Sequence, residues 1–175
     1  GPTVVANAEE PLIVWAARGA KKVIWVDTLT VWQQDSSLCP ECGAGIVREQ
    51  PDPETGRRGT WRCTGCDLSK PIATWRVAGD TIVDPDGTAH EPRLRVPGSF
   101  NVSNAALALA AAYELGVDVE TALRGFRKVT SPAGRFATAK FGDTTARLLL
   151  AKNPAGWAEA LPIMATDTVV LAIDS

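Results

Sequence analysis

The sequence lacks the features that mark membrane-spanning and nucleic-acid-binding proteins. No apolar run approaches the roughly 20 residues that a transmembrane helix needs, and no low-complexity segment or internal repeat is present. Lysine and arginine together number 18 against 20 aspartate and glutamate residues, so the net charge is -2 and there is no basic excess for tracking phosphates. We therefore expect a globular protein with no transmembrane segment and no nucleic-acid partner.

Histidine is also scarce: His90 is the only histidine in the 175 residues. It stands in a polar run typical of a loop, and we expect a solvated side chain rather than a ligand. Hydrophobic residues make up 45% and charged residues 22% of the chain, close to globular averages. A chain of this length suffices for one sizeable core or two small ones.

Cysteine is confined to one stretch, CPECGAGIVREQPDPETGRRGTWRCTGC. Two Cys-x-x-Cys pairs stand at its ends with twenty residues between them: Cys39, Cys42, Cys63 and Cys66. Gly43 follows the first pair and Gly65 interrupts the second, which lets backbone amides turn toward metal-bound sulfurs. Four thiolates in a tetrahedron form the closed geometry of structural zinc and leave no open position for a catalytic water.

Two disulfides or a redox-active Cys-x-x-Cys are the alternative interpretations of these pairs. No signal-peptide pattern precedes the pairs, and a redox motif does not need a duplicate at this spacing. The sequence therefore predicts a structural zinc ribbon at about 36–72 in a reduced, cytoplasmic protein. Arginine and acidic side chains between the cysteines cancel in number, so we interpret the ribbon as a scaffold or docking element.

The rest of the chain alternates apolar runs with helical patterns, which predicts an α/β fold. Before the ribbon we expect a strand at 3–8, a helix from 11 to about 20 and a strand at 21–27, with the strands parallel. The elements expected after it are a hairpin at 72–87 turning at Gly79-Asp80, a helix at 101–115 ended by Gly116, a helix from its cap Asp118 to Arg127, strands at 136–141 and 145–151, a helix from Pro154 and a strand at 168–174.

Three short motifs carry candidate binding residues. Asn101 and Asn104 stand three apart at a helix start and share one face beside free backbone N–H groups, although helix capping also explains them. Arg135 follows a glycine in a hinge-like turn, where most arginines are surface residues. Lys152 and Asn153 stand between a strand and a helix, where open α/β sheets bind ligands, although Asn-Pro is also a common cap.

Taken together, GSFNVSNAALALAAAYELGVDVETALRGF, GRF and KNPAGW resemble the Mur ligase superfamily. The cysteine ribbon narrows the resemblance to the MurT branch, because the amino-acid-adding Mur ligases lack such a ribbon. The resemblance implies parts of two domains. Residues 1–133 are similar to the second half of the middle, ATPase domain with the ribbon inserted at about 36–72, and residues 134–175 are similar to the beginning of a Rossmann-like C-terminal ligase domain.

The resemblance also implies a reaction, at the inner face of the bacterial membrane. MurT-like proteins use ATP and Mg²⁺ to phosphorylate the α-carboxylate of the D-glutamate in lipid II, and ammonia from a glutaminase partner, GatD, displaces the phosphate. An acyl phosphate supplies the leaving group that a carboxylate lacks. In this family Asn101 and Asn104 lie by the adenine, Arg135 approaches the nucleotide, and Lys152 and Asn153 face the ATP site.

The sequence departs from the family pattern in three places. Phe100 stands where other Mur ligases usually carry histidine, and LLLA precedes Lys152 where they carry an acidic residue. No Gly-x-x-x-x-Gly-Lys-Thr/Ser phosphate loop occurs in these residues. We therefore expect a piece of a longer enzyme, with its catalytic residues elsewhere and without activity alone.

Two other functional classes remain open at this point. One is a stand-alone zinc-ribbon module that binds a protein partner and performs no ATP chemistry. The other is a different ATP-dependent carboxylate-amine ligase that has acquired a ribbon. A nucleotide titration tests the first class, because adenine-dependent changes near Asn101 would exclude a module without an ATP site. Identifying the amidated substrate would distinguish the second class from a MurT-like enzyme.

Overall fold

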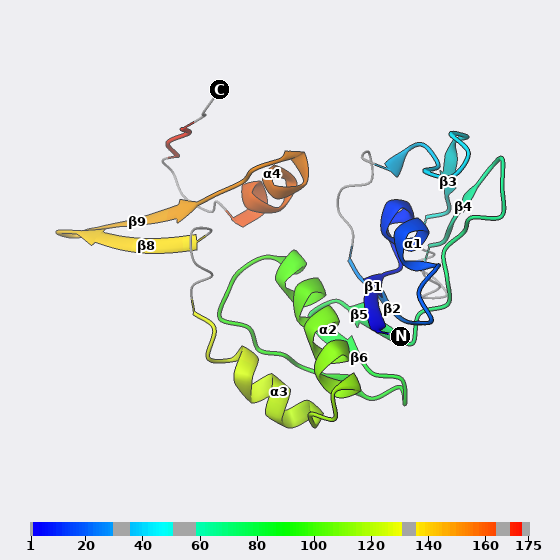
Figure 1. The fold of residues 1–175 in the computed structure, drawn as a ribbon. Helices are drawn as coiled ribbons and strands as arrows, with labels where there is room; N and C mark the ends of the chain where they lie inside the picture. Colours follow the sequence, from blue (N-terminus) through cyan, green and yellow to red (C-terminus); the bar gives the residue numbers. More distant parts are fainter. Residues whose placement is uncertain (1, 30–35, 51–58, 131–135, 164–168, 173–175) are drawn as a thin grey trace.

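The structure is a computed structural model that describes residues 2–29, 36–50, 59–130, 136–163 and 169–172. Within these residues the chain combines helices with one larger and two small sheets, which confirms the α/β prediction (Figure 1). No helix in the described ranges combines the length and the apolar character needed to cross a bilayer.

The larger sheet has five strands in the order β1-β2-β5-β6-β7. The first three run parallel and the last two are antiparallel additions. Their bounds are β1 (Thr3–Asn7), β2 (Lys22–Asp27), β5 (Trp75–Ala78), β6 (Thr81–Val83) and β7 (Ala89–His90). The predicted hairpin is confirmed as β5 and β6, which turn at Gly79 with a positive φ of 57°.

Helix α1 (Pro11–Ala17) connects β1 to β2, as the sequence predicts. Proline at the first helical position has no N–H to leave unsatisfied, and its fixed φ suits the start of a helix. Val14 and Ala17 are buried on one side of α1, whereas Leu12 and Ile13 are exposed. The strand–helix–strand order places the carboxyl ends of β1 and β2 at the same edge of the sheet.

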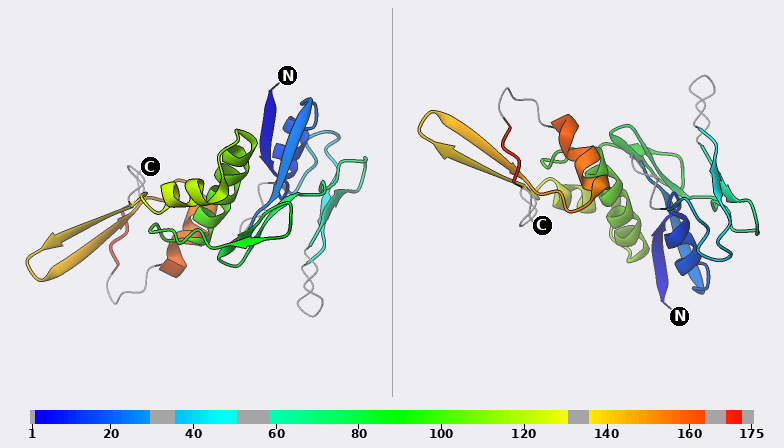
Figure 2. Two further views of the ribbon diagram at one scale, coloured as in Figure 1. Left: turned by 90° about the horizontal axis from the view of Figure 1, so that it is seen from below. Right: turned by 90° about the horizontal axis from the view of Figure 1, so that it is seen from above.

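Two layers cover the sheet on opposite faces. Helices α2 (Ser99–Glu114) and α3 (Val119–Phe126) pack with Val26, Val77 and Ile82 in the main core. The neighbouring Trp25 packs instead with Val14 of α1 and with the cysteine-containing segment. Successive strand residues point to opposite faces, so consecutive residues of β2 belong to different cores. Figures 1 and 2 show the two layers on either side of the sheet, α2 and α3 on one side and α1 with the cysteine-containing segment on the other.

The ends of α2 and α3 follow local signals in the sequence. Gly116, with φ 81°, terminates α2, and the Asp118 carboxylate caps α3 by accepting a hydrogen bond of 2.9 Å from the Thr121 N–H. The N-cap of α2 is Gly98, and no side chain caps this end. The asparagines at the start of α2 therefore do not cap its N–H groups.

The cysteine-containing segment lies between the adjacent parallel strands β2 and β5. We call its described residues 36–50 and 59–72 the ribbon. They include two short antiparallel strands, β3 (Ile46–Arg48) and β4 (Trp61–Cys63), which form their own sheet. The buried residues of the ribbon and α1 make a second core: Val14, Cys39, Trp61, Cys63 and Leu68. The ribbon is thus packed onto the α1 face of the sheet.

Strands β8 (Phe136–Phe141) and β9 (Thr144–Leu149) form a hairpin that pairs with no other strand in the described residues. Helix α4 (Pro154–Ala160) begins where the sequence predicts and continues into a 3₁₀ turn, Leu161–Ile163. The expectation of a Rossmann-like domain here stays a prediction, as does the domain boundary near 134.

Two expectations need correction. The strand expected at 168–174 is wrong for residues 169–172, which form no strand; Val170 is 88% exposed. An apolar run becomes a strand only where a neighbour accepts its backbone hydrogen bonds. His90 is not a solvated loop residue, because it lies in β7 with its Nε2 2.8 Å from Asp84 Oδ2. Burial acts against ionisation of Asp84, but the His90 contact and the Thr88 N–H outweigh it and lower the pKa of that carboxyl.

Candidate metal centre

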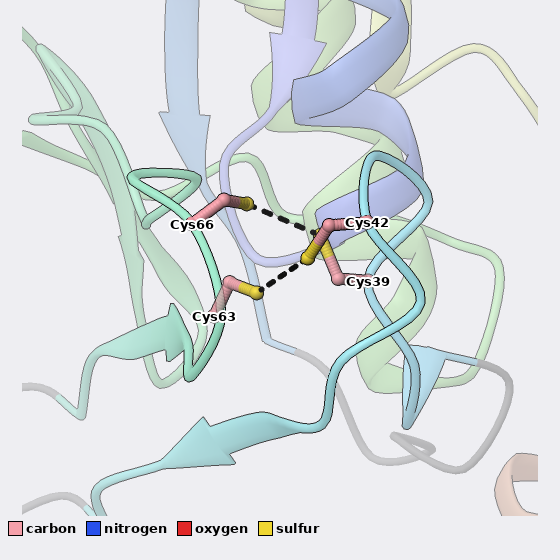
Figure 3. A group of neighbouring side chains, drawn as sticks. All are labelled: Cys39, Cys42, Cys63 and Cys66. Carbon is pink, nitrogen blue, oxygen red and sulfur yellow. Dashed lines mark hydrogen bonds between the residues drawn. The ribbon is translucent and has the colours of Figure 1, made fainter.

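The structure brings the four cysteine side chains together at one end of the ribbon (Figure 3). All four sulfurs lie within 4.8 Å of one another, with Sγ–Sγ distances of 3.6 Å for Cys39–Cys66 and 3.4 Å for Cys42–Cys63. None of the four is in a disulfide. A tetrahedral zinc with Zn–S bonds of about 2.3 Å places its sulfurs about 3.8 Å apart. The observed spacing therefore fits a four-sulfur metal site.

Backbone N–H groups surround these sulfurs. The Gly65 N–H donates to Cys63 Sγ at 3.2 Å, and the Ala44 and Leu68 amides donate to Cys42 and Cys66. A Cβ at Gly65 would lie 2.7 Å from the Ala44 Cβ and 3.3 Å from Cys42 Sγ, so glycine is required where the two cysteine loops meet. Amide donors of this kind orient thiolate ligands and offset their charge.

The thiols of the cysteine cluster differ in how readily they ionise. Burial acts to raise the pKa of the Cys63 thiol, but the Gly65 N–H and the neighbouring thiols favour its thiolate and lower that pKa to about 6. The Leu68 N–H favours ionisation of Cys66, yet burial and the other sulfurs outweigh it and raise the pKa of Cys66 to about 12. Thiolate is the form of cysteine that binds metal. The lowered pKa of Cys63 therefore favours metal binding near neutral pH.

Glu41, between the first two cysteines, attaches the first loop to α1. Its Oε2 accepts hydrogen bonds from Trp15 Nε1 at 2.5 Å and from an Arg18 guanidinium nitrogen at 2.6 Å. The Arg18 and Glu41 side chains are each about two-fifths exposed, so the ion pair alone contributes little, about 0–1 kcal/mol. Packing of Val14 against the ribbon core adds the apolar part of this contact.

A second polar cluster lies at the carboxyl ends of β1 and β2. Lys70 Nζ donates to Glu9 Oε1 at 2.5 Å, to Asp27 Oδ1 at 3.2 Å and to the Gly59 carbonyl at 3.0 Å. The three charged side chains are only 9%, 15% and 10% exposed. This cluster was not predicted from the sequence. The acidic residues just after two parallel strands were the available signal, since ligands and charged groups gather at that edge.

The predicted nucleotide residues occupy three different surroundings. On α2, Asn101 is half-buried and its amide donates to the Pro97 carbonyl at 2.5 Å, whereas Asn104 is exposed. Lys152 is exposed, and Asn153 caps α4 by accepting from the Gly156 N–H at 2.8 Å. Arg135 lies outside the described residues. Within the described ranges, no hydrogen bond or ion pair joins the α2 asparagines to Lys152 or Asn153, so their common site stays a prediction.

No family model matches the chain, but curated proteins do. It is 28% identical over 145 residues to the lipid II isoglutaminyl synthase (glutamine-hydrolyzing) subunit MurT of Streptococcus pneumoniae, covering 78% of this chain and 31% of that protein. It is 37% identical over 134 residues to the MurT subunit of Staphylococcus aureus, covering 74% and 30%.

A second type of relative shares a shorter segment. The UDP-N-acetylmuramoyl-L-alanyl-D-glutamate--2,6-diaminopimelate ligase of Corynebacterium glutamicum is 41% identical over 84 residues, which is 47% of this chain and 16% of the ligase. The chain thus spans about a third or less of the length of the curated relatives it matches.

Proposed function

Since the chain is a MurT-like member of the Mur ligase family, we propose that it is part of an ATP-dependent ligase that amidates the D-glutamate of lipid II in peptidoglycan synthesis. The observation that carries this proposal is the similarity to two MurT subunits over about three quarters of the chain. The four-cysteine cluster on the segment inserted between the parallel strands β2 and β5 supports it, because the cysteines would serve the fold rather than the reaction.

The proposed reaction has two steps. A carboxylate oxygen of the glutamate attacks the γ-phosphorus of ATP, and the bond to the β-phosphate oxygen breaks to release ADP. Ammonia then attacks the carbonyl carbon of the acyl phosphate, inorganic phosphate leaves with the bonding electron pair, and the nitrogen loses a proton to water. Mg²⁺ would neutralise the phosphate charges of ATP. A GatD-type glutaminase would supply the ammonia by hydrolysing glutamine.

Five residues of this chain are proposed to contact the nucleotide. Asn101 and Asn104 lie one turn apart at the start of α2, where the exposed Asn104 amide is free to meet an adenine edge. Arg135 would approach the phosphates, and the exposed Lys152 with Asn153 would face them from the start of α4. We place the reaction in the cytoplasm, at the inner membrane face, because ATP is available there.

We propose that Cys39, Cys42, Cys63 and Cys66 hold one structural Zn²⁺. Their sulfur spacing, the amide donors around them and a closed four-sulfur set fit zinc, which prefers tetrahedral thiolate coordination. The metal would supply no step of the reaction; it would join the two cysteine loops of a segment with little apolar core of its own.

The test uses the whole protein that contains these residues, with its glutaminase partner, Mg-ATP, glutamine and lipid II. Mass spectrometry should show conversion of the glutamate carboxylate to an amide, with release of inorganic phosphate. Omitting glutamine while supplying ammonium should preserve the product. Failure to form the amide under both conditions would refute the proposed amidation.

The similarity to a diaminopimelate ligase supports a second candidate, because the same acyl phosphate could be attacked by an amino acid instead of ammonia. The product mass separates the two: an amide is formed in one case, and a whole amino-acid residue is added in the other. A mass increase with diaminopimelate on a UDP-linked muramoyl dipeptide would favour this alternative.

A further inference from the structure

Four side chains of the ribbon hold the turn that follows β1. We call residues 8–10 the β1 turn. Trp61 Nε1 donates to the Ala8 carbonyl at 2.9 Å in a buried contact, and an Arg48 guanidinium nitrogen donates to the Glu9 carbonyl at 3.2 Å. The other two are Lys70, which reaches the Glu9 carboxylate, and Ser36, whose hydroxyl donates to Glu10 Oε2 at 2.9 Å. The ribbon therefore binds both backbone and side chains of this turn.

Lys70 is the most constrained of these contacts. Its ammonium group has three N–H donors, and the structure gives it three acceptors: Glu9, Asp27 and the Gly59 carbonyl. The side chain is 9% exposed. A buried ammonium is costly unless it is paired and fully hydrogen-bonded, so small displacements of Lys70 are opposed by both carboxylates.

The position of Lys70 depends on the second cysteine loop. The Lys70 N–H donates to the Trp61 carbonyl at 2.9 Å, and the Cys63 N–H donates to the Leu68 carbonyl at 2.8 Å. These bonds close the chain around Cys63 and Cys66, and the Leu68 amide in turn donates to Cys66. The loop that carries two of the sulfurs thus also sets the backbone that carries Lys70.

We propose that Lys70 is a positioning residue that couples occupancy of the four-cysteine site to the conformation of the β1 turn and Asp27. The metal orders the second cysteine loop, the loop places Lys70, and Lys70 holds the two carboxylates at the carboxyl ends of β1 and β2. Parallel sheets bind ligands at this edge. The ribbon packs on the α1 face of the sheet, and from there it would influence the shape of the ligand-binding edge. The inference rests on the proposed metal site but not on the proposed ligase activity.

Coupling between two sites is reciprocal. If bound metal favours the Lys70 contacts, then removing those contacts must weaken metal binding by the same factor. Coupling of this kind typically changes affinity about 5- to 150-fold. We therefore expect Lys70→Gln to lower the affinity for Zn²⁺ by at least about fivefold, although no cysteine is changed.

The experiment measures Zn²⁺ affinity by competition with a chromogenic chelator in the full chain and three variants. Lys22→Gln is the matched control, because it removes a lysine that pairs with Glu114 in an exposed contact away from the ribbon. Ile82→Val is the stability control, since it trims a fully buried residue in the main core, remote from the ribbon core. Both controls should retain wild-type affinity, and Lys70→Gln should not.

Hydrogen exchange provides the reciprocal measurement. Chelating the metal should speed exchange at residues 8–10 and 27–29, while β5 and β6 stay protected. If Lys70→Gln does not fold, Glu9→Gln at pH 8 takes its place, because it removes one carboxylate charge facing Lys70 and keeps the side-chain shape. A smaller loss of affinity is expected for that variant.

The outcomes separate the two proposals. A wild-type chain that binds no Zn²⁺ overturns the metal site and the coupling with it. A chain that binds Zn²⁺ with equal affinity in wild type and Lys70→Gln overturns the coupling alone. An equal loss in Ile82→Val also overturns it, because the effect would then follow global stability rather than the Lys70 contacts.

Discussion

Glu9 is a partly buried carboxyl whose titration should make the stability of the protein depend on pH. Burial and a hydrogen bond shared with Asp27 raise the pKa of Glu9 to about 7, although Lys70 acts to lower it. The charged groups facing it are Asp27, Lys70 and the Arg48 guanidinium, which contacts its backbone carbonyl. The folded protein therefore keeps a proton on this carboxyl at pH values where the unfolded chain loses it.

This difference predicts that the free energy of unfolding falls as the pH rises from about 4.5 to about 7, the ordinary and the folded pKa of Glu9. The loss is at most about 3 kcal/mol, since one pKa unit corresponds to about 1.4 kcal/mol and partial exposure reduces it. Glu9→Gln should flatten this part of the curve. Urea denaturation at several pH values measures the free energy of unfolding, with Glu120→Gln, a change at an exposed position of α3, as the control. An unchanged slope in Glu9→Gln would contradict the assignment.

Cys63 is the residue whose change should have the clearest effect on metal content. Cys63→Ser removes one of four sulfurs from a closed set and replaces a buried side chain of the ribbon core. We expect loss of the metal and unfolding of the ribbon. Elemental analysis of reduced protein measures the metal, and hydrogen exchange at residues 61–63 reports unfolding of the ribbon. Ser69→Ala, an exposed change in the same loop, should keep both; zinc-free wild-type protein would refute the site.

At the scale of a single element, α2 combines a buried anchor with an exposed face. Ser103 is buried, and its hydroxyl oxygen accepts from the Leu29 N–H at 3.1 Å while also lying 3.3 Å from the Leu29 carbonyl. This contact fixes the start of α2 against the chain leaving β2. The next residue, Asn104, points outward.

Adjacent alanine substitutions in α2 should therefore affect different properties, one the stability and the other the nucleotide affinity. Ser103→Ala leaves the partly buried Leu29 N–H without its partner and should lower the free energy of unfolding by about 1–3 kcal/mol. Asn104→Ala should change stability by less than about 0.5 kcal/mol and weaken nucleotide binding in the whole protein. Denaturant unfolding and nucleotide titration measure the two effects. Equal nucleotide affinity in Asn104→Ala would remove this residue from the proposed site.

At the scale of the whole molecule, the sequence predicts a joint between two bodies near residue 134, in the run TSPAGR, most of which lies outside the described residues. Residues 1–133 and 135–175 should then move separately, and limited proteolysis should cut this run first. A glycine-containing connection with few contacts is the usual site of such cleavage. Initial cleavage elsewhere, with this run intact, would favour one rigid unit.

Residues 1–175 alone should neither hydrolyse ATP nor form the amide. Phosphoryl transfer needs a cradle of backbone amides, a lysine and Mg²⁺ ligands around the β- and γ-phosphates, and the sequence has no phosphate-loop motif. Catalysis at ordinary rates lowers a barrier by at least roughly 8 kcal/mol, whereas one exposed cation such as Lys152 contributes about 0–1 kcal/mol. A phosphate-release assay tests this, and turnover equal to that of the whole enzyme would contradict it.

Local signals in the sequence were enough for most elements and for the cysteine site. Pro11 at the start of α1, Gly116 at the end of α2 and Asp118 at the start of α3 act through their own backbone geometry or a hydrogen bond to a near neighbour. In each cysteine pair, two residues separate one cysteine from the other, so the chemistry of Cys39 with Cys42 and of Cys63 with Cys66 is visible in the spacing. Such interactions need no knowledge of the rest of the fold.

Tertiary structure alone decided which distant groups meet. Glu9, Asp27 and Lys70 are separated by up to 61 residues, and only the parallel pairing of β1 with β2 and the packing of the ribbon on α1 bring them together. The same dependence explains the error at 169–172, because an apolar run has no strand partner until the fold supplies one. Spacing was enough to predict which cysteines come together. Burial and strand pairing produced the cluster of Glu9, Asp27 and Lys70, because its contacts arise between segments and not within one.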